Sequence, residues 1–251
     1  MTAPVFVVET ERIAAAAPGT VVRLDGPEGR HAAAVKRLTA GEAVTLADGL
    51  GLGVDGTVAE VLGKDAIDVA VAAVRREPEP APAPRIVVVQ ALPKGDRGEL
   101  AVETMTEVGV DVVIPWSASR CITQWKGDRG AKALAKWRAT AREAGKQSRR
   151  LRFPEVREPM TTRQLAPVLA AAAFAAVLHE EGSRPLAHAE LPEGGDLVLV
   201  VGPEGGVSPE ELAAFAEAGA GPYRLGPSVL RTSTAGVAAG ALLLGRTGRW
   251  S

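Results

Sequence analysis

The chain of 251 residues is 46% hydrophobic and 4% aromatic, which is enough apolar sequence to bury one large core or two smaller ones. Its 29 lysines and arginines nearly balance its 30 aspartates and glutamates, so a uniformly basic nucleic-acid binder is excluded. A single cysteine, the lack of a signal-peptide pattern at the N-terminus and the lack of a long apolar run together predict a soluble cytoplasmic protein.

The first part of the chain has the pattern of a small all-β unit. Apolar and β-branched runs separated by turn residues predict strands at residues 5–8, 20–24, 43–46, 53–62 and 67–74. Only residues 29–38 read as a helix. These signals predict a small β-barrel or curled sheet of about 75 residues.

Residues 77–84 read Glu-Pro-Glu-Pro-Ala-Pro-Ala-Pro, with four prolines in eight positions. Proline at this density prevents a helix or a central strand and favours a stiff, extended spacer. We therefore predict a barrel domain at residues 1–76, a linker at residues 77–84 and a second domain at residues 85–251.

The second domain alternates between continuous apolar runs and helical patterns. Strands are predicted at residues 86–92, 110–115, 174–179, 197–201 and 223–225, and helices at residues 97–108, 128–148, 161–173, 209–218 and 234–246. This alternation is typical of an α/β domain with a mostly parallel sheet covered by helices on both faces.

Positive charge is concentrated in the predicted helix at residues 128–148 and its flanks. Between Arg120 and Arg152 there are eleven basic residues and two acids, a net charge of +9. A four-residue spacing places four of the cations on one helical face: Arg138, Arg142, Lys146 and Arg150. Such a face is either simply solvated or a track for nucleic-acid phosphates, and the near absence of acids favours the track.

Two glycine-bearing loops follow buried strands near the C-terminus. One reads Gly202-Pro203-Glu204-Gly205-Gly206 ahead of the helix start Ser208-Pro209, and the other runs from Leu225 to Gly236. The first loop is neither a P-loop nor a dinucleotide-binding motif. Glycine lets backbone groups approach a ligand closely, so the pair predicts one bipartite ligand site, although each loop alone could be an ordinary turn.

Arg231 precedes the last predicted helix, where its charge opposes the helix dipole, so it is a candidate functional residue. Gly236 and Gly240 in that helix predict close packing, either within the domain or across a dimer. The three histidines give no metal-ligand spacing, so no metal is expected, and each is expected to have an ordinary structural or surface role.

Several motifs together resemble the RsmE family, ribosomal RNA uridine-N3 methyltransferases of the SPOUT superfamily. They are Lys94-Gly95-Asp96-Arg97, Glu107-Val108-Gly109-Val110-Asp111, Gln147-Ser148-Arg149-Arg150, Gly202-Pro203-Glu204-Gly205-Gly206, and Leu225-Gly226-Pro227 followed by Leu230-Arg231 and Thr234-Ala235. The N-terminal part is similar to the family's PUA-like RNA-binding barrel, with His31 and Lys36-Arg37-Leu38 in the matching place.

The resemblance implies a C-terminal domain with a deep trefoil knot, S-adenosylmethionine bound in that knot, a homodimer, and a uridine of small-subunit (16S) ribosomal RNA as substrate. The residues that it implies for the cofactor are Leu178, His179, Gly202, Pro203, Glu204, Gly205, Gly206, Leu225, Gly226, Leu230, Thr232, Thr234 and Ala235. The residues expected to bind RNA are His31, Lys36, Arg37, Lys94, Arg97, Arg138, Arg142, Lys146, Arg149 and Arg150. Lys146 departs from the family pattern, which has an acid there, and is expected to strengthen the basic face.

Methyl transfer needs the nucleophile in line with the methyl group, so positioning is a large part of the catalysis. Arg231 stays protonated and is a poor base, so its expected role is to stabilise the developing uridinate. Glu204 is a candidate either to take the N3 proton or to complement the positive charge of the cofactor, and the sequence does not choose.

Two other functions remain open at this stage. One is a related knotted methyltransferase that acts on a ribose 2′-OH or on transfer RNA. The other is a non-catalytic RNA-binding protein whose glycine loops hold a regulatory nucleotide. The exact target nucleotide is also open, as is the choice between naked RNA and the assembled subunit.

Overall fold

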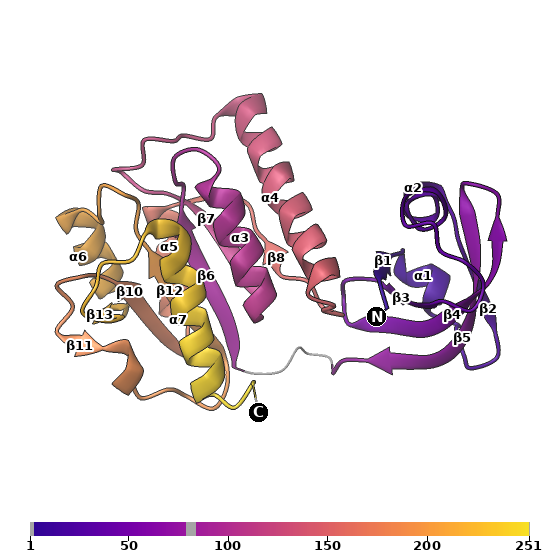
Figure 1. Ribbon diagram of the computed structural model, residues 1–251. Coiled ribbons are helices and arrows are strands. Elements are labelled where there is room, and N and C mark those ends of the chain that lie inside the picture. Colours follow the sequence, from indigo (N-terminus) through magenta and orange to yellow (C-terminus); the bar gives the residue numbers. More distant parts are fainter. Residues whose placement is uncertain (1–2, 79–83, 251) are drawn as a thin grey trace. The chain divides into compact units, whose positions relative to one another are not determined.

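The computed structural model describes residues 3–78 and 84–250 (Figure 1). Contacts between Cα atoms divide the chain into two compact units. One unit comprises Met1–Ala81 and Gly145–Phe153, and the other comprises Pro82–Ala144 and Pro154–Ser251. Most of the predicted linker, residues 79–83, lies outside the described residues.

The first unit contains a mixed five-stranded sheet with the order β1-β3-β4-β5-β2. Its strands are β1 (Val5–Val7), β2 (Val21–Leu24), β3 (Ala43–Ala47), β4 (Leu52–Leu62) and β5 (Ala66–Arg76). Strand β1 is parallel to β3, and the other pairs are antiparallel. All five predicted strands are present. Among the described residues, the hydrogen-bonded path runs from β1 to β2 without a pair between these two end strands, so the predicted alternative of a sheet is observed and a closed barrel is not.

The helical part of this unit differs from the prediction. Helix α2 (Gly26–Arg30) begins earlier than expected and continues as a π-helical turn, His31–Val35, in which the Lys36 N–H donates to the His31 carbonyl at 2.8 Å. A short helix, α1 (Thr10–Ile13), was not predicted. It is stabilised by burial of Ile13 in the core of the unit, a tertiary effect that four residues of sequence do not reveal.

Residues 145–153 group with the first unit, although the sequence prediction placed them in the second domain. The Phe153 N–H donates to the Gly49 carbonyl at 2.8 Å, and the Gly51 N–H donates to the Leu151 carbonyl at 3.0 Å. Leu151 is 6% exposed and packs with Val5 and Ala47. These contacts between distant segments have no local sequence signal.

The environment of Lys146 differs from the expectation that this side chain binds RNA. Its ammonium forms an ion pair with Glu28 at 2.9 Å, and the two side chains are only 9% and 16% exposed. The predicted phosphate-binding lysine is therefore engaged inside the first unit, since its charge is compensated by an acid far away in the sequence.

The second unit is built on a parallel sheet with the order β11-β13-β10-β12-β6-β7-β8, and β9 also pairs with β7. The strands are β6 (Arg85–Ala91), β7 (Val112–Ser117), β8 (Glu155–Val156), β9 (Met160–Thr161), β10 (Phe174–Leu178), β11 (Arg184–Pro185), β12 (Asp196–Val201) and β13 (Gly221–Arg224). The five predicted strands of this domain are confirmed, whereas the two-residue strands β8, β9 and β11 were not predicted.

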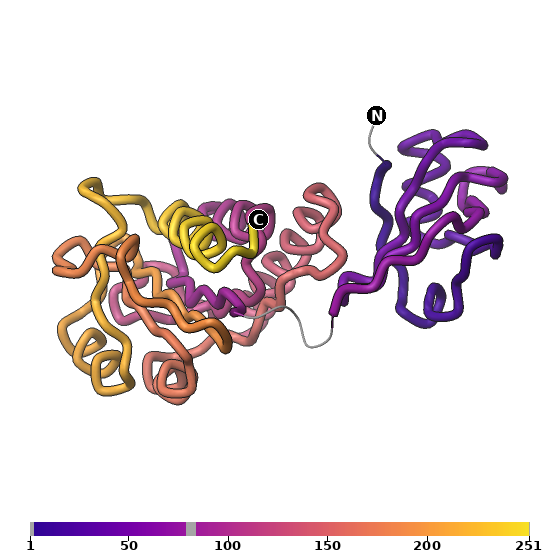
Figure 2. Tube along the Cα trace, turned by 90° about the horizontal axis from the view of Figure 1, so that it is seen from below, coloured from indigo at the N-terminus to yellow at the C-terminus, as the bar shows by residue number. Residues whose placement is uncertain are grey.

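Helices cover both faces of this sheet, as expected from its continuous apolar strands. They are α3 (Arg97–Val108), α4 (Gly127–Gln147), α5 (Thr162–Ala170), α6 (Pro209–Glu217) and α7 (Thr232–Arg246). Helices α3 and α7 pack side by side on one face, and α5 and α6 lie on the other (Figure 2). Ser208 caps α6 as predicted, and Glu211 completes a capping box with it. Among the described residues, no helix is long and apolar enough to cross a membrane.

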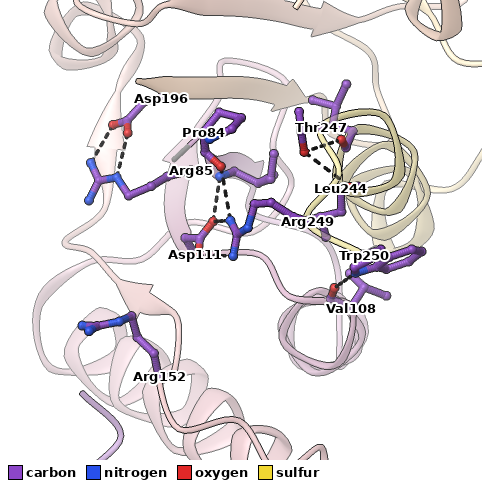
Figure 3. A network of polar contacts seen from close by, with 12 residues as sticks. Pro84, Arg85, Val108, Asp111, Arg152, Asp196, Leu244, Thr247, Arg249 and Trp250 are labelled. Carbon is purple, nitrogen blue, oxygen red and sulfur yellow. Dashed lines mark hydrogen bonds and ion pairs between the residues drawn. The ribbon is translucent and has the colours of Figure 1, made fainter. Parts of the chain in front are cut away.

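Helix α7 packs closely against its neighbours. A Cβ atom on Gly236 would lie 2.8 Å from the Met105 sulfur of α3, and one on Gly240 would lie 3.1 Å from a methyl group of Val110. The small-residue spacing therefore serves packing within the domain. At the far end of the helix, the Arg249 guanidinium binds the carboxylate of Asp111, which also accepts the Ile86 N–H at 2.8 Å (Figure 3).

The ion pair between Lys146 and Glu28 predicts a stability effect. Lys146→Ala leaves Glu28 largely buried without this partner, so we expect the free energy of unfolding to fall by about 2 kcal/mol. Lys64→Ala, at an exposed turn position, is the control and should change stability by less than about 0.5 kcal/mol in the same urea titration. Equal stabilities of the two variants would contradict a structural role for Lys146.

Candidate active site

Three loops meet at the carboxyl edge of the parallel sheet, after β10, β12 and β13. Together they enclose a pocket of about 320 Å³. Its lining residues are Arg97, Leu178, His179, Glu180, Val201, Gly202, Pro203, Glu204, Gly206, Val207, Val229, Leu230, Arg231, Thr232 and Ala235. This edge is where open α/β sheets bind ligands.

A second hollow of about 190 Å³ shares Leu178, His179 and Leu230 with the first. It also shares Glu180, Val229 and Ala235 with the first, and it is lined in addition by Arg224 and by the segment from Leu225 to Ser228. The two glycine loops of the sequence therefore contribute to one bipartite site, as predicted.

Thr232 joins the two glycine loops. Its hydroxyl donates to the Gly202 carbonyl at 2.7 Å. The same hydroxyl accepts a bond from the Gln90 side-chain amide at 3.1 Å, and that amide also lies 3.3 Å from the Thr232 carbonyl. Gln90 is fully buried at the end of β6. These bonds fix the start of α7 against the central strands.

The two glycine loops present backbone groups to the site. Gly206 has a φ of +74°, which favours glycine, and a Cβ on Gly226 would meet no atom within 4 Å. Within the part of the chain that the structure describes, the N–H groups of Gly226, Ser228, Val229 and Leu230 donate no hydrogen bond to the protein. The loop therefore offers open space and main-chain donors to a ligand.

The other part of the site is charged. Arg97 at the start of α3 and Arg231 just before α7 both line the larger pocket, and among the described residues neither forms an ion pair. Glu204 lies in the same pocket, and one of its carboxylate oxygens accepts the Lys94 N–H at 3.2 Å. Glu180 also lines this pocket, so two acids accompany the two arginines. Because neither guanidinium is engaged in an ion pair among the described residues, both are available to an anion or a developing negative charge.

A buried carboxylate, that of Glu211, binds the loop after β7 next to the pocket. Glu211 is 5% exposed, and its Oε1 accepts the Ser119 N–H at 2.7 Å and the Thr162 hydroxyl at 3.1 Å. Arg120 follows in the same loop and donates to the Gly205 carbonyl at 3.2 Å. The loop after β7 is thereby fastened to the glycine loop after β12.

Two neighbouring titratable groups are unsuited to catalysis. Burial raises the pKa of the Cys121 thiol, because loss of solvent disfavours the thiolate, so the group stays protonated. Its own backbone N–H and the Ser208 hydroxyl hold the pKa of Glu210 below its ordinary value. Neither side chain lines the pocket. No cluster of three or more metal-ligating side chains occurs within residues 3–78 and 84–250.

Comparisons with known proteins agree with this architecture. Residues 79–244 match the model of an RNA methyltransferase domain, and residues 24–72 match that of an RNA methyltransferase PUA domain. The ribosomal RNA small subunit methyltransferase E of Mycobacterium bovis is 44% identical over 236 residues, which cover 92% of this chain and 89% of that protein. The chain belongs to this family.

Two solved structures resemble this family member along almost its whole length. The ribosomal RNA small subunit methyltransferase E of Neisseria gonorrhoeae, bound to S-adenosylmethionine, is 27% identical, with a TM-score of 0.82 and 98% coverage of both chains. A Legionella pneumophila methyltransferase in complex with the same cofactor is 28% identical, with a TM-score of 0.83 and 98% coverage of both chains.

Most residues expected at the cofactor site of this methyltransferase line the two hollows. The exceptions are Gly205 and Thr234, which line neither. Gly205 instead faces Arg120, whose Cβ would lie 3.2 Å from a Cβ at that position.

The residues expected to bind RNA are dispersed. Arg97 lies in the pocket, whereas Arg138 binds Glu158 at 2.9 Å and the Val156 carbonyl at 3.1 Å. His31 lies edge-on to Phe6 with ring centroids 5.8 Å apart. Five of the others are exposed: Lys36, Arg37, Lys94, Arg142 and Arg149. Arg150, which lies beyond the end of α4, is partly buried.

Sequence reasoning missed Gln90, Arg120 and Glu211. Gln90 had a usable signal, since it is the one uncharged polar residue at residues 86–92 of an otherwise apolar strand. Arg120 bonds to Gly205, and Glu211 bonds to Ser119. These contacts join loops that are distant in the sequence, so no periodic pattern predicts them.

The bond from Thr232 to Gly202 predicts an asymmetry between two threonines of α7. Thr232→Val keeps the shape but removes the donor to the Gly202 carbonyl and one of the acceptors of the Gln90 amide, so the free energy of unfolding should fall by about 1–3 kcal/mol. Thr234→Val is the matched control, because that hydroxyl is exposed and bonds only within its own turn. Denaturant titration of both variants tests this, and a similar small loss in each would refute the role of Thr232.

Proposed function

We propose that this protein transfers the methyl group of S-adenosylmethionine to N3 of a uridine in small-subunit (16S) ribosomal RNA. The observation that carries the proposal is the bipartite site, in which a backbone-lined hollow adjoins a pocket with two arginines that form no ion pair within residues 3–78 and 84–250. Such a site suits a reaction that needs a held methyl donor and a stabilised anionic nucleophile. The family relationship supplies the donor and the class of RNA.

The residues of the smaller hollow fit S-adenosylmethionine. Leu178 and Leu225 supply apolar surface, and Gly226 leaves the space that a Cβ would fill. The main-chain donors from Gly226 to Leu230 suit the polar edge of an adenine and a carboxylate. When bound, the cofactor supplies an electrophilic methyl group that is lost from sulfur as the bond to N3 forms.

Arg231 is proposed as the catalytic residue. Uridine N3 becomes a nucleophile by losing its proton, and the resulting charge spreads over the uracil oxygens. A guanidinium that remains protonated stabilises that charge without acting as a base. Arg231 lines the larger pocket and precedes Thr232, whose bonds fix the start of α7, so the backbone from which the Arg231 side chain projects is held in place.

We also propose that the chain forms the deep trefoil knot and the homodimer of its superfamily. Support for both comes from the family relationship. The bonds of Thr232 to Gly202 and Gln90 bring the start of α7 against the loop after β12 and the strand β6. Because the proposed substrate is ribosomal RNA, we propose that the protein acts in the cytoplasm. The proposed form of the substrate is the assembled small subunit.

RNA contacts are proposed for the first unit through Arg37 and Arg149. Both are exposed, and both have a positive φ, +55° and +59°, that non-glycine residues rarely adopt. This backbone conformation costs of the order of 1 kcal/mol. Each arginine follows a helix end, where the Leu38 N–H donates to the Ala32 carbonyl at 3.1 Å and the Arg150 N–H to the Gly145 carbonyl at 3.0 Å, so the left-handed conformation closes the helix. The proposal of RNA contact rests on the exposure and the charge of the two side chains.

The decisive experiment is a methyl-transfer assay with labelled S-adenosylmethionine on undermethylated small subunits. Digestion and mass spectrometry of the nucleosides should identify 3-methyluridine. A 2′-O-methyl nucleoside, or labelling of transfer RNA alone, would favour the related knotted methyltransferases. Cofactor binding without any transfer would favour a regulatory RNA-binding protein.

Arg231→Ala should lower the rate of transfer by at least about a hundredfold, because the developing charge loses its preorganised partner. Binding of S-adenosylmethionine, measured by calorimetry, should stay within about threefold of wild type, since the backbone-lined hollow is kept. A rate close to wild type would rule out this role for Arg231.

Arg37→Gly should separate RNA affinity from stability. Glycine accepts the positive φ, so the free energy of unfolding should stay equal or rise by up to about 1 kcal/mol. The slope of log Kd against log salt should fall by about 0.7–0.9, the loss of one phosphate contact. The control is Arg163→Ala. Arg163 is an exposed cation of α5 and is not among the residues expected to bind RNA, so this change should leave the slope unchanged. An unchanged slope for Arg37→Gly would show that Arg37 is merely solvated.

A further inference from the structure

Glu204 connects the glycine loop after β12 to a third loop of the site. Its Oε1 accepts the main-chain N–H of Lys94, in the loop between β6 and α3, at 3.2 Å. Three residues later that loop leads into Arg97, which lines the same pocket as Glu204. A single carboxylate therefore holds the segment that carries one of the two pocket arginines.

The segment that carries Glu204 is itself restrained. Arg120 donates to the Gly205 carbonyl at 3.2 Å, and Gly205 is too close to Arg120 for a larger side chain to fit without displacement. Val207 and Ser208 are buried, and Ser208 starts α6. With its backbone fixed on both sides, Glu204 presents its carboxylate to the Lys94 loop from a defined position.

We propose that Glu204 is a positioning residue that holds Lys94, and through it Arg97, at the substrate side of the pocket, and that it does not accept the N3 proton. This inference rests on the proposed function. Arg97 and Arg231 together stabilise the uridinate, so the proton leaves N3 for solvent water at the exposed mouth where Glu204 lies. Glu204 is then not needed as a base, but its carboxylate oxygen is needed to accept the Lys94 N–H.

Two substitutions separate the roles, because glutamine keeps the acceptor oxygen but cannot take a proton. Glu204→Gln should retain kcat/KM for RNA within about threefold of wild type, and Glu204→Ala should lose about tenfold, the lower range for a hydrogen bond to a charged group. The loss should fall mainly in KM for RNA, since Arg97 moves while the cofactor hollow is kept. Glu217→Ala, an exposed acid at the end of α6, is the matched control and should leave activity unchanged.

Two further measurements strengthen the test. The pH–rate profiles of wild type and Glu204→Gln should have the same shape. In a double-mutant cycle, Arg97→Ala should remove most of the effect of Glu204→Ala, because the second residue acts through the first. A Glu204→Gln variant as inactive as Glu204→Ala, or a wild-type acid limb that disappears in it, would identify Glu204 as the base and overturn the proposal.

A readout that does not depend on activity keeps this result separate from the proposed function. Amide hydrogen exchange at Lys94 in the full-length protein should speed up in Glu204→Ala and stay close to wild type in Glu204→Gln. Unchanged exchange in Glu204→Ala would overturn the positioning role even in an active enzyme. A wild-type protein that methylates no uridine would instead refute the proposed function.

Discussion

The site depends on a final helix that is fixed at both ends. At its start, Thr232 bonds to the Gly202 carbonyl and to the Gln90 amide, and at its far end Arg249 binds Asp111, which also holds the Ile86 N–H at the beginning of β6. Both anchors lead to the same central strand, so α7 cannot shift along the sheet without breaking one of them. Arg231 directly precedes this helix, so its backbone is held in place as well.

The remaining loops are joined by single polar side chains rather than by a large apolar contact. Glu211 links the start of α6 to the loop after β7, and Arg120 links that loop to Gly205. Polar links of this kind have defined directions, whereas apolar packing does not. An enzyme that works chiefly by placing two reactants in line benefits from directional restraints at the ends of a rigid sheet.

The sequence predicted the elements far better than the contacts between them. Ser208 and Pro209 marked the start of α6, and continuous apolar strands indicated the parallel sheet, because both signals are local. Lys146 was misassigned since Glu28, its partner, lies 118 positions away. The same reason hid the packing of Leu151 with Val5 and Ala47. The bipartite pocket was predictable because each half follows directly from a strand–loop–helix pattern.

The two hydrogen bonds that hold the pocket loops differ in a way that suits their partners. The bond from the Thr232 hydroxyl to the Gly202 carbonyl is short, and Thr232 is buried, so water does not compete for this bond. The loops around the proposed cofactor site are therefore held firmly. The bond from Lys94 to Glu204 is longer and exposed, and therefore easier to open. A small cofactor of constant shape calls for the first kind of restraint. A large RNA, which must present one base to Arg97 and Arg231, is better served by a loop that is held in place yet able to yield as the base enters.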